Sequence, residues 1–140
     1  MTEYVWTKDR MPEECYRIRF EVFIREQQFS AETDERDFHC WHLLGRKDGR
    51  PFAAARIFSD DGRVWHIGRV AVLREYRGHG AGSALLRECE RKAAELGAGS
   101  FVLDAQVRAK HFYEQSGYRV CGEEHLDEYC PHVPMRKDAE

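Results

Sequence analysis

The sequence predicts one α/β domain spanning residues 1–140, and three observations support this fold class. The chain has 140 residues, of which 42% are hydrophobic and 34% charged, so it can build one core but is too short for two full domains. Short apolar segments separated by turn residues fill much of its first half, which is typical of an antiparallel meander. A strand, an amphipathic helix and another strand follow between Val64 and Ala105, and that order implies a parallel crossover.

The first part of the chain is predicted to contain a strand, a helix and a loop. Tyr4 to Thr7 has the composition of a short strand. Pro12 to Glu14 opens a helix, because proline is tolerated in the first helical turn and carboxylates interact favourably with the positive end of the helix dipole. We expect this helix to end near Gln27 and the segment Phe29 to Asp37 to form a polar loop.

Three strands are predicted next, at Phe38 to Leu44, Phe52 to Phe58 and Val64 to Leu73. The turn sequences Lys47 to Arg50 and Asp60 to Gly62 separate them and favour tight hairpins. Strands joined so closely pair antiparallel, so this region forms the predicted meander.

The second half is predicted to contain two helices among shorter strands. Between Gly80 and Leu96, apolar residues recur at helical spacing and charged residues occupy the other face. Phe101 to Ala105 is a short buried strand, and Val107 to Ser116 is a second amphipathic helix. The last strands are expected at Tyr118 to Cys121 and His132 to Met135.

Charge and composition disfavour several classes of protein. Lys and Arg number 22 against 25 Asp and Glu, and a net charge of -3 does not suit nucleic-acid binding. No apolar run reaches the roughly 18 residues of a membrane span, and the first residues lack the features of a signal peptide. Five scattered cysteines without a CxxC pair fit reduced thiols, most of them in the core. We therefore expect a cytoplasmic protein that binds neither nucleic acid nor membrane.

A glycine-rich loop is the most informative segment. It covers Arg77 to Ser83, between the apolar strand ending at Leu73 and the helix that begins near Gly80. Glycines allow tight turns and expose successive backbone N–H groups, and the start of a helix adds about half a positive charge. This loop is therefore expected to bind phosphate oxygens, with Arg77 as an additional cation.

Two common phosphate-binding motifs fit this loop poorly. The Gly-Lys-Ser/Thr sequence of a P-loop is missing. A dinucleotide-binding fold would use Gly78 and Gly80 with Asp104 as the ribose contact, but Ser83 stands where its third glycine would be. Too little chain also follows Gly78 to build a doubly wound sheet. A loop whose glycines only make a tight turn is the remaining alternative.

The sequence resembles the GCN5-related N-acetyltransferase (GNAT) superfamily, and specifically its ElaA-type branch. Two motifs carry this resemblance: Arg77-x-x-Gly80-x-Gly82 after Val70-Ala71-Val72, and Ala109-x-x-Phe112-Tyr113-Glu114-x-x-Gly117-Tyr118. Further segments extend the resemblance over nearly the whole chain, namely Arg19-x-x-Val22-Phe23-x-x-Glu26-Gln27, His42-Leu43-Leu44-Gly45, Ile67-Gly68-Arg69-Val70-Ala71-Val72 and Pro131-His132-Val133-Pro134-Met135.

The resemblance implies a fold, an activity and a cosubstrate. The fold would be a mixed, mostly antiparallel sheet of six or seven strands with helices on both faces and splayed central strands. The activity would be acetyl transfer from acetyl-CoA to a primary amine on a small molecule or a protein, and homodimers are common in the family. Gln106 stands where many members have asparagine. The cofactor contacts would fall on Val70, Ala71, Val72, Arg77, Gly78, His79, Gly80, Ala81, Gly82, Ser83, Asp104, Gln106, Ala109 and Phe112.

The same resemblance suggests catalytic residues. Tyr113 stands where the family places the hydroxyl that protonates the departing thiolate, although its helical spacing also suits a core aromatic residue. His66 stands where some members carry a glutamate base, and its alternative is a solvent-exposed strand residue. Glu26, Asp37 and His132 are the other candidate bases, because the resemblance places their segments around the acceptor pocket. A non-catalytic acetyl-CoA-binding module is the alternative function.

No metal site is predicted. His39 and His42 lie on opposite faces of an alternating strand, and no other close pair of ligands is present. The acidic run from Glu32 to Asp37 is expected to be a solvated loop, with a lid that attracts a cationic amine as the alternative.

Overall fold

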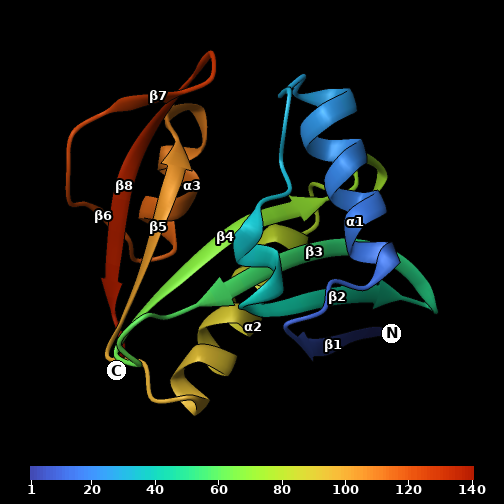
Figure 1. Ribbon diagram of the computed structural model, residues 1–140, viewed down its shortest axis with the longest axis horizontal. Helices are drawn as coiled ribbons and strands as arrows, with labels where there is room; N and C mark the ends of the chain where they lie inside the picture. Colours follow the sequence, from blue (N-terminus) through green and yellow to red (C-terminus); the bar gives the residue numbers. More distant parts are fainter.

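The computed structural model describes residues 1–140 and contains one eight-stranded sheet in the order β1-β2-β3-β4-β5-β8-β6, with β7 paired to β8 (Figure 1). Only β4 and β5 pair in parallel, and every other pair is antiparallel. This confirms a mixed, mostly antiparallel sheet with one crossover. The strands are β1 (Thr2–Lys8), β2 (Trp41–Lys47), β3 (Arg50–Phe58), β4 (Val64–Val72), β5 (Ser100–Gln106), β6 (Arg119–Val120), β7 (His125–Asp127) and β8 (Cys130–Asp138).

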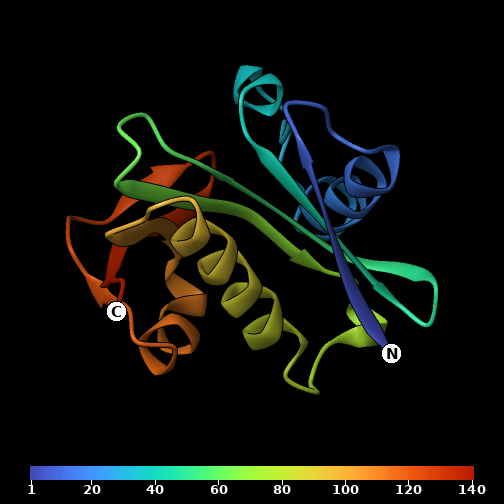
Figure 2. The same cartoon turned by 90° about the horizontal axis from the view of Figure 1, so that it is seen from below.

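Helices cover both faces of the sheet, as predicted (Figure 2). Successive strand residues point to opposite faces, so Leu44 and Ala54 pack with the first helix, whereas Leu43 and Ala53 belong to the larger core under α2. None of the helices combines the length and the apolar composition that a membrane crossing requires. The helices are α1 (Glu13–Arg19), its π-helical continuation (Phe20–Glu26), α2 (Ala81–Glu95) and α3 (Lys110–Gln115), with 3₁₀ turns at Glu35–Phe38, Arg74–Tyr76 and Val107–Ala109.

The two central strands separate along their length. β4 and β5 pair only at Val64↔Ser100, Trp65↔Phe101 and His66↔Val102, and beyond His66 they diverge (Figure 1). The expected splay is thereby confirmed. Its consequence is that two strand edges face each other across an opening in the middle of the sheet, where backbone groups have no strand partner.

A β-bulge marks β4 at the start of this opening. β3 pairs Ala54 with Ala71 and then Arg56 with Gly68, so β4 contains one extra residue. Arg69 lies in this interval with a φ of 51°. Bulges bend a strand and redirect its side chains. The bulge therefore helps to turn β4 away from β5 and aims Arg69 toward the opening.

The predicted strand number and several element bounds were wrong. The sheet has eight strands because His125–Asp127 adds β7, although these residues are all exposed and lack the pattern of a buried strand. The helix expected to end at Gln27 does so, but its last turns are π-helical, with the Gln27 N–H donating to the Val22 carbonyl. β2 begins at Trp41 rather than Phe38, because Glu35–Phe38 forms a 3₁₀ turn first.

Candidate active site

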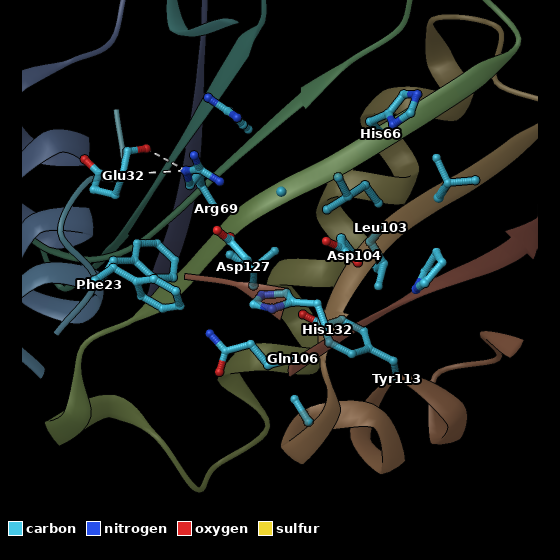
Figure 3. Close-up of a pocket in the computed structure, with 18 of the residues that line it drawn as sticks. Phe23, Glu32, His66, Arg69, Leu103, Asp104, Gln106, Tyr113, Asp127 and His132 are labelled. Atoms are coloured by element: carbon cyan, nitrogen blue, oxygen red, sulfur yellow. Dashed lines mark hydrogen bonds and ion pairs between the residues drawn. The ribbon is translucent and has the colours of Figure 1, made fainter. Parts of the chain in front are cut away.

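A cavity of about 600 Å³ lies at the opening between β4 and β5 (Figure 3). In Figure 3, Phe23 and Glu32 line one side, and Asp104, His132 and Tyr113 line the other. The lining residues come from β3, β4, β5, β7, β8, α3 and the 3₁₀ turn before it, and from the π-helix and the segment that follows it: Phe23, Gln27, Phe29, Ala31, Glu32, Arg56, Phe58, His66, Ile67, Gly68, Arg69, Val70, Val102, Leu103, Asp104, Gln106, Ala109, Tyr113, His125, Asp127, His132 and Pro134.

Strand register shows that the cavity is reached from both faces of the sheet. Directly paired residues share a face, and Phe58↔His66 and His66↔Val102 place these three on the face that α1 covers elsewhere. Tyr113, in contrast, comes from α3 and packs against the core on the opposite face. The two predicted catalytic residues, His66 and Tyr113, therefore approach one cavity from opposite sides.

The hydroxyl of Tyr113 is available for a proton transfer. Its ring packs edge-on against Phe112 and Tyr118, with centroids 5.0 Å and 6.0 Å away, so the packing that fixes the ring leaves its outer edge at the cavity. The hydroxyl makes no hydrogen bond within the protein, whereas that of Tyr118 donates to Glu90. Burial raises the pKa of Tyr113 to about 12, which keeps the hydroxyl protonated at neutral pH.

His66 is half-buried in the cavity wall. Its imidazole stacks on Phe58, and neither ring nitrogen has a hydrogen-bond partner within the protein. Burial lowers the pKa of His66 below its usual value, with smaller opposing effects from nearby charges. The imidazole is therefore neutral at pH 7, with a nitrogen free to accept a proton.

The cavity also holds a histidine that the sequence analysis missed. His125 Nε2 donates to Asp104 Oδ1 at 2.8 Å, and this contact raises the pKa of His125. Both side chains are about half exposed and line the cavity. The sequence contains little to indicate that His125 lies in the cavity, because the residue belongs to a segment without strand patterning. Asp104, predicted as a cofactor contact, is thus the partner of a histidine in this structure.

His132 lies where the sequence analysis expected an acceptor-pocket residue. It lines the cavity, and its Nδ1 donates to the Cys130 carbonyl at 2.9 Å. Nδ1 therefore carries a hydrogen, and Nε2 has no hydrogen-bond partner within the protein. Its ring centroid lies 6.0 Å from that of His125 and 6.4 Å from that of Phe29.

Buried ion pairs form the wall beside Arg69. Arg19 donates to Glu32 Oε2 at 2.7 Å and to both carboxylate oxygens of Asp37, and Arg56 donates to Asp37 at 2.9 Å. Glu32 and Asp37 are only 6% and 5% exposed. The prediction that this acidic run is a solvated loop was therefore wrong for Glu32 and Asp37, whose carboxylates are partners of buried arginines, whereas Asp34 and Glu35 are exposed.

Asp37 is poorly suited to act as a base. Burial would raise its pKa, but the hydrogen bonds and charge of Arg19, together with the charge of Arg56, outweigh burial and hold the pKa at about 2. It does not line the cavity. Glu26, another candidate base, also lies outside the lining and is paired with Arg77.

Replacing Asp37 by Asn should strongly destabilise the fold. It removes the carboxylate that Arg19 and Arg56 share and leaves each buried guanidinium with one remaining partner, Glu32 or Asp34, and breaking a buried pair costs about 3–5 kcal/mol. Because the pKa of about 2 lies below the unfolded value of about 3.9, this stabilisation is present above that range and is lost as pH falls toward 2. Urea unfolding at pH 7 and pH 3 measures both effects. Glu13→Gln, which removes an exposed ion pair with Arg17, is the control; equal midpoints for the two variants would contradict the prediction.

The glycine-rich loop has the geometry of an anion site, but its arginine is already paired. Gly78 and Gly80 adopt φ values of 89° and 78°, and Gly80 is the N-cap of α2. The Arg77 guanidinium donates twice to Glu26, at 2.6 Å and 2.7 Å, and its Nε donates to the Val72 carbonyl. The loop therefore offers backbone N–H groups and a helix start, whereas Arg77 links it to the end of the π-helix.

The residues predicted to contact the cofactor fall into three groups: those that line the large cavity, those that line a second hollow, and those that line neither. Val70, Asp104, Gln106 and Ala109 line the large cavity. His79, Gly80 and Ala81 line a separate hollow of about 130 Å³ at the start of α2. The remaining predicted contacts line neither, namely Ala71, Val72, Arg77, Gly78, Gly82, Ser83 and Phe112.

The Gln106 amide is fixed across the cavity. Its Nε2 donates to Gln27 Oε1 at 2.9 Å, and its Oε1 accepts a hydrogen bond from Arg108 Nε at 2.7 Å. Gln27 follows the π-helix, whereas Gln106 ends β5, so this bond joins the two sides of the opening.

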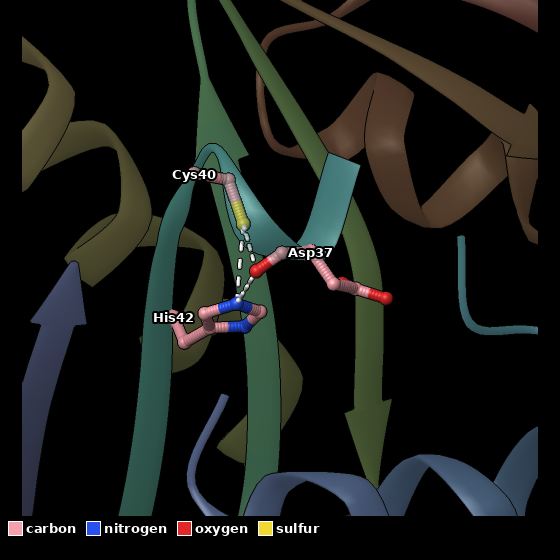
Figure 4. Close-up of side chains that lie close together, drawn as sticks. All are labelled: Asp37, Cys40 and His42. Carbon is pink, nitrogen blue, oxygen red and sulfur yellow. Dashed lines mark hydrogen bonds between the residues drawn. The ribbon is translucent and has the colours of Figure 1, made fainter. Parts of the chain in front are cut away.

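One buried cluster contains metal-ligand residue types but does not fit a metal ion. Ligand atoms of Asp37, Cys40 and His42 lie within 4.8 Å of one another (Figure 4). The Asp37 carboxylate already accepts from two arginines, and burial raises the pKa of Cys40 to about 11, so its sulfur is a thiol. His42 Nε2 donates to the Asp37 carbonyl at 2.8 Å. The cluster is a hydrogen-bonded part of the core.

Known proteins resemble this chain over nearly its full length. The acetyltransferase (GNAT) domain family matches residues 7–139. The uncharacterized N-acetyltransferase YjcF of Bacillus subtilis (strain 168) is 37% identical over 128 residues, which cover 89% of this chain and 91% of YjcF. The crystal structure of Escherichia coli ElaA is 26% identical with a TM-score of 0.88 and covers 99% of this chain and 100% of its own. An acyl-CoA N-acyltransferase from Pseudomonas aeruginosa is 25% identical with a TM-score of 0.86 and covers 98% and 99%.

Proposed function

This chain belongs to the GNAT acetyltransferase family, and from that premise we propose that it transfers the acetyl group of acetyl-CoA to a primary amine by direct attack of the amine. The observation that carries the proposal is the cavity at the splayed strands. Tyr113 reaches it from one face of the sheet and His66 lines it on the other. A donor and a proton acceptor thus approach one space from opposite sides.

The opening fits the cosubstrate that this family uses. The unpaired edges of β4 and β5 suit an extended pantetheine arm, which would bind as an additional strand. The exposed N–H groups of Gly78 and Gly80 and the start of α2 suit a pyrophosphate. Acetyl-CoA, when bound, supplies an activated thioester. The remaining requirements are to hold the amine, remove its proton and return a proton to the leaving sulfur.

The chain's residues would divide these tasks between the two sides. The neutral imidazole of His66 takes a proton from the acceptor ammonium, because only the free amine has a lone pair for attack. The Tyr113 hydroxyl donates a proton, or a strong hydrogen bond, to the departing thiolate. Another histidine, His125, faces the same cavity with Asp104 as partner and is a competing candidate for the base, as is His132, which also lines the cavity.

The pH dependence of kcat/KM should identify the base. A neutral imidazole accepts a proton and an imidazolium does not, so the rate rises with pH through the pKa of the base. We call this rise of kcat/KM with pH the acid limb of the profile. Burial lowers the pKa of His66, so an acid limb due to His66 should have its midpoint below about 6.5. Asp104 raises the pKa of His125, so a limb due to that residue would lie above about 6.5.

His66→Gln should remove this limb, and His125→Gln should leave it in place. Both variants and the parent are compared on one acceptor, because the amine's own deprotonation also makes the rate rise with pH. A limb that survives in His66→Gln and disappears in His125→Gln would assign the base to His125.

Turnover with a panel of primary amines tests the proposed activity itself. Purified protein and acetyl-CoA are incubated with small amines and lysine peptides, and mass spectrometry follows the acetylated products. Amine-dependent product formation is the expected result. Tight acetyl-CoA binding without product formation for any member of the panel would favour the non-catalytic binding module.

A further inference from the structure

We infer that Phe58 and Arg36 are positioning residues for His66: they fix the plane of its imidazole and hold the ring in the neutral form. The inference rests on the proposed function, in which His66 accepts the proton of the acceptor ammonium. It concerns two residues outside the motifs that identify the family, one on β3 and one in the 3₁₀ turn before β2.

The first step is the contact between His66 and Phe58. The two residues face each other directly in the β3–β4 register. Their rings are parallel, with an interplanar angle of 0° and centroids 4.7 Å apart. No hydrogen bond within the protein holds either nitrogen of His66, so this stacked contact defines the plane of the ring and leaves both nitrogens available at the cavity.

Arg36 also contacts the phenyl ring of Phe58. Its guanidinium carbon lies 4.1 Å from the centre of the phenyl ring. Arg36 comes from the 3₁₀ turn before β2 and His66 lies on β4, so the phenyl ring of Phe58 contacts side chains from two separate segments of the chain. These two contacts link the guanidinium, the phenyl ring and the imidazole, and we refer to the three groups as the column.

This column disfavours protonation of His66. The negative face of an aromatic ring attracts a cation, but here the phenyl ring already interacts with a guanidinium. A proton on His66 would place a second cation on the same ring and repel the first. Half-burial against Phe58 also removes water that would solvate an imidazolium.

The charges that surround the column partly oppose one another. Asp60 and Asp61, in the β3–β4 turn, favour the protonated form of His66, whereas Arg36 and burial disfavour it, and together these effects lower its pKa. Asp60 also pairs with Arg36 at 3.1 Å, which divides its charge between two partners. Arg56, the other arginine near Phe58, lies 6.0 Å from the ring centre and is bound to Asp34 and Asp37.

Titration of His66 by NMR tests the inference without relying on activity. Arg36→Met removes the cation, and Phe58→Leu removes the flat ring; each should move the pKa of His66 upward, toward the usual value of about 6.5. Phe58→Tyr keeps the stacking surface and should preserve the parent pKa. Arg91→Met removes an exposed arginine from α2 and serves as the control for loss of a charge. An unchanged His66 pKa in both Arg36→Met and Phe58→Leu would overturn the inference.

Kinetics add the positional part of the test. Phe58→Leu should lower kcat by up to about 10²-fold, because a misplaced catalytic group loses much of its effect, while KM for acetyl-CoA changes little. Phe58→Tyr should restore kcat. If Phe58→Leu does not fold, Arg36→Met provides the test, because the Arg36 side chain is partly exposed. This variant should move the acid limb of the kcat/KM profile to higher pH.

The experiments can reject the proposed base, His66, and the proposed positioning role of Phe58 and Arg36 independently of each other. A shifted His66 pKa in these variants, together with an acid limb that persists in His66→Gln, would support the column and reject His66 as the base. A normal kcat and an unshifted limb in Phe58→Leu, in a protein that loses activity in His66→Gln, would keep the base and reject the positioning role.

Discussion

Gly82→Asp is expected to abolish acetyl-CoA binding in a protein that remains folded. Gly82 lies in the first turn of α2, where a carboxylate interacts favourably with the helix dipole, so the helix itself is not harmed. A Cβ there would lie 3.5 Å from Phe112, which is an ordinary contact. The added charge would face the proposed pyrophosphate, and two like charges about 4 Å apart cost on the order of 4 kcal/mol, or roughly 10³-fold in Kd.

Two control variants separate charge from shape and from strain. Gly82→Asn has nearly the same size as the aspartate without its charge, and should retain much more of the affinity. Gly80→Asp should also abolish binding, and Gly49→Asp matches its backbone strain, because the φ values are 78° and 81°. Gly49 lies in the β2–β3 turn and has no neighbour within 4 Å of a Cβ. Calorimetric titration with CoA measures the affinities, and full affinity in a folded Gly82→Asp would reject the loop as the phosphate site.

The sequence could predict this loop because its signals are local. The glycines, the following helix and the preceding strand lie within one short stretch, and their spacing is sufficient to predict that a helix starts a few residues after the end of β4. The same is true of the Tyr113 motif, where helical spacing and a following glycine define α3. The prediction that β4 and β5 splay apart, in contrast, came from the family resemblance, because no residue pattern indicates where two parallel strands stop pairing.

The charged wall of the cavity could not be predicted from the sequence. The run Glu32 to Asp37 has the composition of a solvated loop, and its partners lie elsewhere in the chain: Arg19 is 18 residues from Asp37 and Arg56 is 19 residues away. Whether an acidic residue is exposed or paired in the core depends on such distant partners. The role of His125 was equally difficult to predict. Its strand, β7, forms only by pairing with β8, and its contact with Asp104 joins residues that are 21 positions apart.

Under the proposed function, the donor and the acceptor would have separate approaches to one reaction centre. The glycine-rich loop and Tyr113 belong to elements that pack on the α2 and α3 face, whereas His66 and the histidines of β7 and β8 lie on the other face. An acceptor entering beside these histidines would meet the thioester through the gap between β4 and β5. Substitutions on the histidine face should therefore change acceptor kinetics more than acetyl-CoA affinity.

Tyr113→Phe is expected to lower kcat by roughly 10²-fold with little change in acetyl-CoA affinity, the scale of a lost general acid. The substitution removes only the hydroxyl, and the packing of the ring against Phe112 and Tyr118 remains. Because burial raises the pKa of Tyr113 to about 12, its hydroxyl stays protonated across the usual assay range, and no alkaline limb should come from it. Tyr118→Phe is the matched control, since that hydroxyl donates to Glu90 and lies outside the cavity lining. Single-turnover measurements keep chemistry rate-limiting; equal rates for the two variants would assign Tyr113 to packing alone, whereas a selective loss in Tyr113→Phe would place its proton on the path of the departing thiolate.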